Sequence, residues 1–140
     1  MDTDQKQLLK TAASEALKNP YPTDASTVFA AAVLTKQNNI YASAQYFSDT
    51  YSLTLHAEQA ALAHAAAHGE GAIKAIAITS NEPKGSFSYP CHMCKQLLWE
   101  SRLRSGTAMQ LLIFDQYGKE ELLDLDKIIN YPWPAINSHA

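Results

Sequence analysis

The sequence predicts an α/β protein, a three-layer α/β/α sandwich on a mixed, roughly five-stranded sheet. Three observations predict this class. Apolar stretches of strand length alternate along the chain with stretches whose apolar residues recur at helical spacing. The connection over residues 115–119 is too short to contain a helix, so the strands on either side of it should run antiparallel. The chain has 140 residues, 46% of them hydrophobic, which is enough for one sizeable core, and we expect a single domain over residues 1–140.

The first part of the chain indicates a helix followed by a strand hairpin. Residues 5–18 carry leucine and alanine at helical spacing, and Asn19–Pro20 ends this helix. Two apolar runs follow, at residues 27–35 and 40–47, on either side of Asn38–Asn39. Because such an Asn pair is typical of a turn, we expect the two runs to pair as antiparallel strands.

The middle of the chain indicates a helix, a strand and a second helix. Residues 56–68 are dominated by alanine, the strongest helix former, and Gly69 ends the helix. Residues 72–79 alternate as a strand does, and a helical stretch covers about residues 91–104. An alanine-rich helix has short side chains, so it can lie very close to a sheet.

The last part of the chain indicates the antiparallel strand pair and a short helix. The run at residues 109–114 and the segment near residues 120–123 are the strands that flank the short connection. A short helix is expected near residues 125–130, before a tail that is rich in proline. This pair of strands makes the sheet mixed.

Composition and charge exclude several classes of protein. The 11 Lys and Arg against 14 Asp and Glu give a net charge of −3, without the basic surface that binding to a nucleic acid polymer requires. No apolar run approaches the roughly 20 residues that span a membrane, and residues 1–6 do not open a secretory signal. Two cysteines are too few for a secreted disulfide scaffold. We therefore expect a cytoplasmic protein with no membrane association.

Two short motifs carry candidate chemistry, each at the start of an expected helix. They read H-x-E at residues 56–58 and P-C-x-x-C at residues 90–94, which together form the signature of zinc deaminases. Thiolate and imidazole are ligands that Zn²⁺ prefers, so His56, Cys91 and Cys94 are the expected metal ligands. Three protein ligands leave a fourth position for water, which is the arrangement of a catalytic zinc site.

Glu58 is the candidate catalytic residue. It lies two residues after the histidine, where its carboxylate can take a proton from the zinc-bound water and pass it to a leaving amine. Zinc lowers the pKa of that water towards about 7, so hydroxide is available at neutral pH. This chemistry is hydrolytic deamination of an amidine-like ring carbon.

Other interpretations of the cysteine pair explain less. A redox C-x-x-C pair would leave His56 and Glu58 without a role, and a four-ligand structural zinc site needs a second cysteine pair that the sequence lacks. An i, i+4 histidine pair on the alanine-rich helix is more often a solvated helix face than a metal site. No chemistry is assigned to the remaining histidines: His64, His68, His92 and His139.

Beyond these motifs, the sequence resembles the cytidine deaminase family. Residues 27–35 are similar to the family's first strand, written VGAALLT, and residues 51–58 to its SYxLTxCAE stretch. Residues 90–96 match PCGxCRQ, and residues 124–129 are similar to the closing TLxELLP. The likeness covers roughly residues 5–133 and implies the cytidine deaminase-like fold, in which the last two strands are antiparallel.

The resemblance implies zinc-dependent hydrolytic deamination of a cytosine nucleoside to its uracil form, with release of ammonia. Carried over by position, His56, Cys91 and Cys94 bind Zn²⁺, Glu58 moves protons, and Ala57 offers a backbone contact near the amino group of the base. The partner is then a small-molecule nucleoside. Small family members are commonly homotetramers, so a homotetramer or a homodimer is expected.

The sequence departs from the family pattern at the residues that bind the ribose, and it allows two roles for a tryptophan near its C-terminal end. The family's N-x-E anchor is replaced here by Gln45 and Phe47, and an unpartnered buried hydroxyl costs about 1–3 kcal/mol. A substrate with an altered sugar or a modified cytosine, as in the blasticidin-S deaminase branch, would fit these residues better, unless Phe47 packs in the core. Trp133 stands about where a family aromatic covers the pyrimidine, or else it packs the tail between prolines.

Two alternatives to a cytosine nucleoside deaminase stay open. One is a deaminase of another small aminated heterocycle, such as a purine, a pterin or a nucleoside antibiotic. The other is a non-catalytic zinc-binding domain with a deaminase fold. Glu58 favours an enzyme, because a domain kept only for binding has no need of a proton carrier beside its metal.

Overall fold

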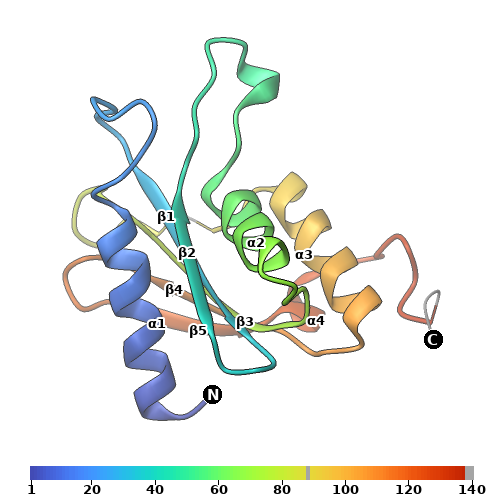
Figure 1. Cartoon of the computed structure of the whole chain (residues 1–140). Helices are drawn as coiled ribbons and strands as arrows, with labels where there is room; N and C mark the ends of the chain where they lie inside the picture. The colour runs from blue at the N-terminus through green and yellow to red at the C-terminus, as the bar shows by residue number, and fades with distance from the viewer. Residues whose placement is uncertain (88, 138–140) are drawn as a thin grey trace.

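The computed structural model describes residues 1–87 and 89–137 and has helices on both faces of one mixed sheet (Figure 1). In chain order the elements are α1 (Thr3–Ala16), β1 (Phe29–Thr35), β2 (Ile40–Ala44), the 3-10 helix η1 (Tyr51–Leu53), α2 (Ala57–Ala67), β3 (Ile73–Ser80), α3 (His92–Ser105), β4 (Gln110–Phe114), β5 (Glu120–Asp124) and α4 (Leu125–Ile128). Each expected helix and strand is present, with ends that shift by a few residues. In the described part of the chain, no helix is both long and apolar enough to cross a membrane.

The sheet has five strands in the order β2-β1-β3-β4-β5. Strand β1 pairs antiparallel with both β2 and β3, β3 and β4 are parallel, and β4 and β5 are antiparallel. The expected hairpin and the expected antiparallel final pair are therefore confirmed. Helix α3 makes the crossover that a parallel β3–β4 pair requires.

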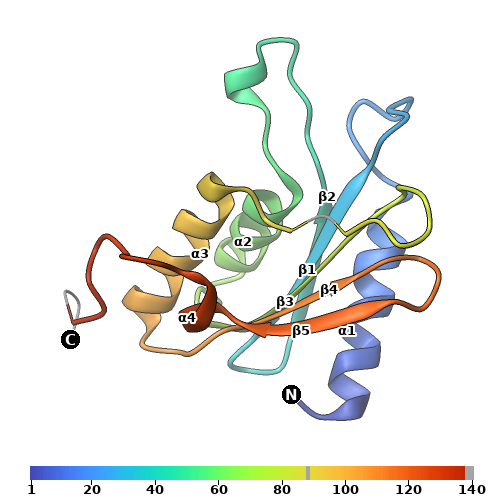
Figure 2. The same ribbon diagram turned by 180° about the vertical axis from the view of Figure 1, so that it is seen from behind.

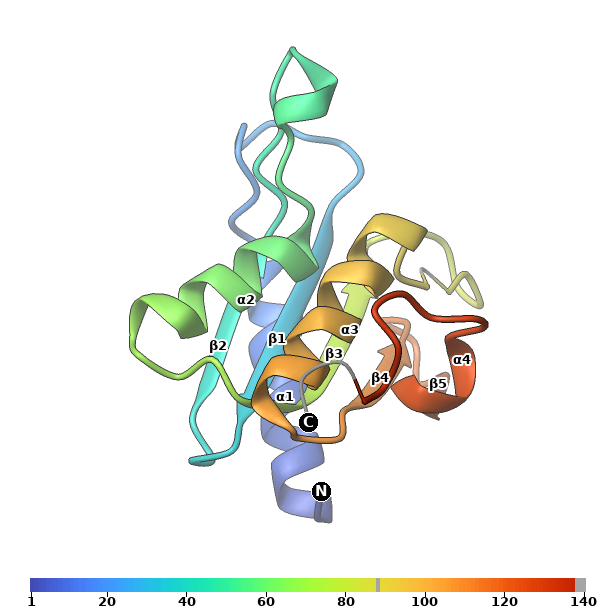
Figure 3. The same cartoon turned by 90° about the vertical axis from the view of Figure 1, so that its right-hand side faces the viewer.

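The two faces of the sheet carry two separate apolar layers. Helix α1 covers one face, and α2 and α3 cover the other, as Figures 2 and 3 show. Along β1, Ala32 and Leu34 face α1, whereas Ala31 and Val33 face α2 and α3. This alternation follows from the period of two of a strand, and it confirms the predicted three-layer sandwich.

Helix α2 packs on the sheet through alanine alone on its inner stripe. Ala57, Ala61 and Ala65, spaced four residues apart, are at most 1% exposed. With no atom beyond Cβ on this stripe, the helix backbone lies close to β1 and β2. His56 is the N-cap of the helix, and Gly69 follows its end with a φ of 77°.

Two helix and strand boundaries differ from those that the pattern predicts. Helix α1 begins at Thr3 because Asp2 caps it: the Asp2 carboxylate accepts from the backbone N–H of Gln5, whose side chain accepts from Asp2 N–H in return. Strand β2 ends at Ala44 and not at residue 47. Residues 45–55, hereafter the arm, leave the sheet and project beyond it between β2 and α2 (Figure 1).

A buried carboxylate joins the hairpin to the end of α2. Glu70 is 8% exposed and accepts hydrogen bonds from Thr35 Oγ1 at 2.7 Å, from Asn39 Nδ2 at 3.0 Å and from the Tyr41 hydroxyl. The Tyr41 hydrogen bond, followed by those of Thr35 and Asn39, lowers the pKa of Glu70 below its ordinary value. This cluster lies at the Thr35 end of β1, away from the motifs at the starts of α2 and α3.

Candidate metal centre and pocket

The starts of α2 and α3 bring the three expected metal ligands together. His56 is the N-cap of α2, Cys91 is the N-cap of α3, and Cys94 lies in the first turn of α3. One donor atom from each residue lies within 4.8 Å of the other two. Among the described residues, this is the one group of three or more His, Cys, Asp and Glu side chains that could hold a metal ion.

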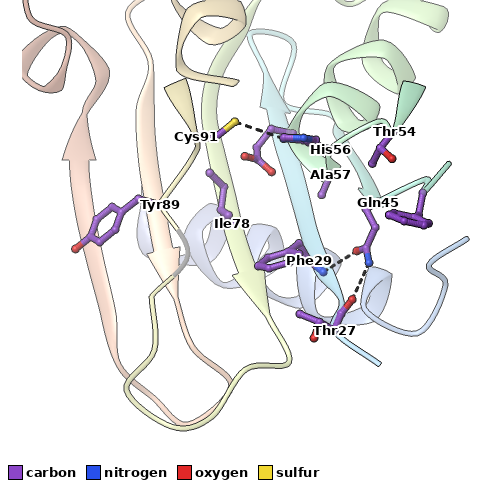
Figure 4. Close-up of a pocket in the computed structure, with 11 residues that line it drawn as sticks. Thr27, Phe29, Gln45, Thr54, His56, Ala57, Ile78, Tyr89 and Cys91 are labelled. Carbon is purple, nitrogen blue, oxygen red and sulfur yellow. Dashed lines mark hydrogen bonds between the residues drawn. The ribbon is translucent and has the colours of Figure 1, made fainter. Parts of the chain in front are cut away.

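The distances between these donor atoms fit a single zinc ion. The Sγ atoms of Cys91 and Cys94 lie 3.5 Å and 3.3 Å from His56 Nδ1, and Figure 4 shows His56 and Cys91 facing each other. A tetrahedral ion with bonds of about 2.3 Å to sulfur and about 2.0 Å to nitrogen separates these atoms by about 3.5 Å. Two sulfurs and one imidazole nitrogen are also the donor types that zinc prefers over calcium or magnesium.

The charge around Cys94 also indicates a cation. Burial raises the pKa of the Cys94 thiol far above its ordinary value, and the nearby Glu58 and Cys91 raise the pKa further. Without a positive charge at this point, the buried thiol would stay protonated. A divalent cation between the two cysteines and His56 supplies that charge and holds the thiolate form.

A pocket of about 420 Å³ opens beside the three ligands. Its lining residues come from β1, the arm, the starts of α2 and α3, β3 and the segment before α3: Thr27, Phe29, Gln45, Phe47, Thr54, His56, Ala57, Glu58, Ile78, Tyr89 and Cys91. Glu58 is 7% exposed, and among the described residues it is the only carboxylate in this lining. The buried Ala57 lies next to Glu58 in the first turn of α2.

The family model for the cytidine and deoxycytidylate deaminase zinc-binding region matches residues 2–109. The chain belongs to this family. The zinc-binding region and the His56, Cys91 and Cys94 group agree with a zinc-dependent enzyme of the deaminase type. No curated protein sequence gives a significant match to the chain.

Solved cytidine deaminases share the fold of this family member. The enzyme from Burkholderia pseudomallei has a TM-score of 0.76 at 22% identity, over 91% of this chain and 95% of that chain. The enzyme from Mycobacterium tuberculosis has a TM-score of 0.74 at 23% identity, over 96% of this chain and 100% of that chain. The enzyme from Bacillus anthracis has a TM-score of 0.67 at 19% identity, over 91% and 89%. The expected cytidine deaminase-like fold is thus confirmed.

The two residues at the family's ribose-anchor positions line the pocket in different ways. The Gln45 side chain turns to β1, where its Oε1 accepts from Phe29 N–H at 2.7 Å and its Nε2 donates to the Thr27 carbonyl at 2.8 Å (Figure 4). Phe47 is 37% exposed, and its ring contacts that of Tyr51 on the same arm. Phe47 therefore stands at the pocket and is not part of the core.

Trp133 does not line the pocket of its own deaminase chain. Its side chain is 77% exposed, and its carbonyl accepts from Gln96 Nε2 at 2.9 Å, which ties the tail to α3. Trp99 Nε1 fastens the same tail by donating to the Pro134 carbonyl at 2.8 Å. The tail thus runs along α3 and leaves the Trp133 ring exposed.

Of the other histidines, the three that the structure describes, His64, His68 and His92, are exposed. His64 Nδ1 lies 3.0 Å from the Ala42 carbonyl, and His68 Nδ1 lies 3.0 Å from the His64 carbonyl. The His68 ring stacks on Tyr41. His92 is exposed at the start of α3, and His139 lies outside the described residues.

Sequence reasoning missed part of the pocket wall. Phe29 and Ile78 lie on neighbouring strands of the sheet, and their side chains form the floor of the pocket below the ligands (Figure 4). The apolar pattern marks both residues as buried, but it cannot say which core residues border a cavity. Tyr89 precedes the cysteine motif, and this adjacency was the one available signal for it.

Proposed function

We propose that this protein catalyses the zinc-dependent hydrolytic deamination of a cytosine nucleoside, cytidine, deoxycytidine or a modified analogue, to the uracil form with release of ammonia. One observation carries the proposal. Glu58 places a nearly buried carboxylate in a pocket that His56 and Cys91 also line, and Cys94 completes their group of three metal ligands. Three metal ligands and one separate acid–base group are what a hydrolytic deaminase needs.

The reaction replaces an amino group on the ring by the oxygen of water. A carbon–oxygen bond forms, the carbon–nitrogen bond breaks, and nitrogen leaves as ammonia. His56, Cys91 and Cys94 would hold Zn²⁺, which when bound makes water acidic enough to react at neutral pH. In this proposal the Glu58 carboxylate takes one proton from the water and gives it to the ring nitrogen, where it stays in the uracil form. Glu58 then takes the second proton of the water from the newly attached hydroxyl and gives it to the leaving amino nitrogen.

The pocket supports a flat aromatic ring beside Glu58. Phe29 and Ile78 offer an apolar floor, and the first turn of α2 presents the backbone of Ala57 at the ligand end (Figure 4). A ring that lies on this floor would be held by its face, while backbone contacts at Ala57 fix its amino edge. This arrangement leaves the substituted side of the ring directed towards the arm.

The proposal includes an oligomer. Trp133 is exposed, tied to α3 by its own backbone, and absent from the pocket lining of its own chain. We infer that the protein forms a homotetramer or a homodimer and that Trp133 covers the pyrimidine in a neighbouring subunit. A single-site change of Trp133 to alanine should then raise KM without altering the zinc content.

Ammonia release by the zinc-loaded protein tests the proposed activity. With cytidine, deoxycytidine and a panel of aminated pyrimidines and purines as substrates, at least one cytosine nucleoside should be turned over. Glu58→Gln, which keeps the size of the side chain, should lower kcat by about 10²–10⁴-fold, because positioned proton transfer contributes this much. The zinc content of this variant, measured by elemental analysis, should stay near that of the native protein.

Cys94→Ala provides the complementary control. It should lose the bound zinc and much of the stability, because a bound metal contributes its binding free energy to the folded state. Release of ammonia only from purines would replace the cytosine substrate by the alternative class. Unchanged turnover in Glu58→Gln would contradict the proton-transfer role of Glu58. If the native protein released no ammonia from any compound of the panel, the result would favour a non-catalytic zinc domain.

A further inference from the structure

The pocket has two ends of different chemistry. At the inner end lie His56, Cys91 and Glu58, which carry the ionisable groups of the described lining apart from the Tyr89 hydroxyl. The outer end is lined by side chains without charge, and Phe29, Phe47 and Ile78 supply its apolar surface. Because the reacting ring occupies the inner end in the proposed function, whatever is attached to that ring must occupy the outer end.

The polar side chains of the outer end are already engaged with the protein. Gln45 uses its oxygen on the backbone N–H of Phe29 in β1 and its nitrogen on the carbonyl of Thr27, just before β1. Thr54 Oγ1 accepts from Ser48 N–H at 3.0 Å and lies 3.4 Å from the Ser48 carbonyl. The Tyr89 hydroxyl donates to Glu121 at 2.5 Å, and its ring points away from the pocket towards β5 (Figure 4).

Among the described residues that line this wall, the remaining polar side chain is that of Thr27, which is exposed at the rim and offers a single hydroxyl. A polyhydroxylated group would therefore give up its hydrogen bonds to water and find few partners on this wall. An unmade hydrogen bond in a partly closed site is costly, whereas an apolar group gains from burial against aromatic rings. The Phe47 ring adds apolar surface to this wall.

We propose that the substituent on the aminated ring is apolar or poor in hydroxyl groups, and that Phe47 on the arm sets this preference. The inference rests on the proposed deamination at the inner end of the pocket. It names a narrower substrate class: aminopyrimidines whose sugar is deoxygenated or replaced by an apolar group. Phe47 is in this view a specificity-determining residue, with no part in the chemical step.

The test compares cytidine with 2′,3′-dideoxycytidine. The two compounds share the reacting ring and the atom that joins it to the sugar, and they differ only in the two hydroxyls of the sugar ring. For the native zinc-loaded enzyme, kcat/KM should favour the dideoxy compound by about tenfold or more, since each buried hydroxyl without a partner costs about a factor of ten.

Two variants on the arm show whether the substrate preference depends on the side chain that lines the pocket or on any charge added to the arm. Phe47→Glu places on the wall a carboxylate that can accept hydrogen bonds from sugar hydroxyls. It should shift the preference towards cytidine by about tenfold or more. Tyr51→Glu adds the same charge to the neighbouring side chain, which contacts Phe47 but does not line the pocket. The native preference should persist in this control. Unchanged melting temperatures show that both variants are folded.

The outcomes distinguish this inference from the proposed function. A native enzyme that turns over cytidine as well as or better than the dideoxy compound overturns the inference and leaves the deaminase activity in place. The inference is also overturned if Phe47→Glu and Tyr51→Glu change the preference equally. If neither these two compounds nor any other cytosine nucleoside of the panel is deaminated, the proposed function fails, and the melting-temperature shift that cytidine and the dideoxy compound each cause ranks the two. Tighter binding of cytidine then overturns the inference, and tighter binding of the dideoxy compound supports it.

Discussion

Replacement of Gln45 by methionine separates a structural role from a substrate-binding role. Gln45→Met keeps the length of the side chain and removes its two hydrogen bonds, to Phe29 N–H in β1 and to the Thr27 carbonyl just before β1. In the structure these bonds attach the start of the arm to the start of β1. We therefore expect the substitution to reduce stability and to leave the choice between substrates unchanged.

The size of the effect follows from the two bonds. An intramolecular hydrogen bond contributes about 0.5–1.5 kcal/mol net, so loss of both should lower the free energy of unfolding by about 1–3 kcal/mol. The bond to Phe29 N–H is partly buried and the bond to the Thr27 carbonyl is exposed. Most of the loss should come from Phe29, whose backbone donor is left without its partner.

Urea denaturation at a fixed zinc concentration measures this loss, and kcat/KM for cytidine and 2′,3′-dideoxycytidine measures the choice between substrates. Both values of kcat/KM should change by the same factor. Gln7→Met is the control, because Gln7 makes a single exposed hydrogen bond within α1 and should change stability by less than about 0.5 kcal/mol. A variant of native stability whose KM rises for cytidine alone would show that Gln45 binds sugar hydroxyls and would refute the structural role.

Two further predictions concern the elements that support the site. Ala61→Leu puts a large side chain between α2 and the sheet, so it should cost about 1–3 kcal/mol of stability. By displacing His56 it should also reduce the zinc that the protein retains on dialysis. The control Ala66→Leu, at an exposed position of the same helix, should change neither the stability nor the retained zinc. Glu70, whose pKa is lowered chiefly by the Tyr41 hydrogen bond, adds stability at neutral pH that is lost as the pH falls through its folded-state pKa. Glu70→Gln should therefore flatten the acid side of a plot of melting temperature against pH; parallel native and variant curves would contradict this.

The metal centre was predictable from the sequence because its residues lie close together along the chain, in two short motifs. His56 and Glu58 lie two residues apart, and Cys91 and Cys94 lie three apart at a second helix start. Each pair is therefore positioned by one turn of chain, and the donor chemistry indicates that the two pairs meet at one ion. The two antiparallel pairs β1–β2 and β4–β5 were predictable for a similar reason, because a short connection leaves few possible pairings.

The outer wall of the pocket was less predictable because it depends on contacts between residues far apart in the sequence. Gln45 is paired with the backbone of β1, 16 residues earlier in the chain, and this partner leaves no mark on the local sequence. The apolar run at residues 40–47 predicted a strand to its end, but the chain leaves the sheet after Ala44. Beyond that point the alternation of a strand no longer says which way Phe47 faces.

The division of the pocket between helix starts and arm has an evolutionary consequence. His56, Cys91 and Cys94 stand at helix starts that are anchored in the core, so substitutions around them endanger the fold and the metal together. Phe47 stands on a projecting segment whose neighbour Tyr51 is almost wholly in solvent. Substitutions of Phe47 can therefore alter which molecule is accepted at little cost to stability. Descendants of such a chain can therefore acquire new substrates by a few changes in the arm, while the ancestral reaction is inherited intact.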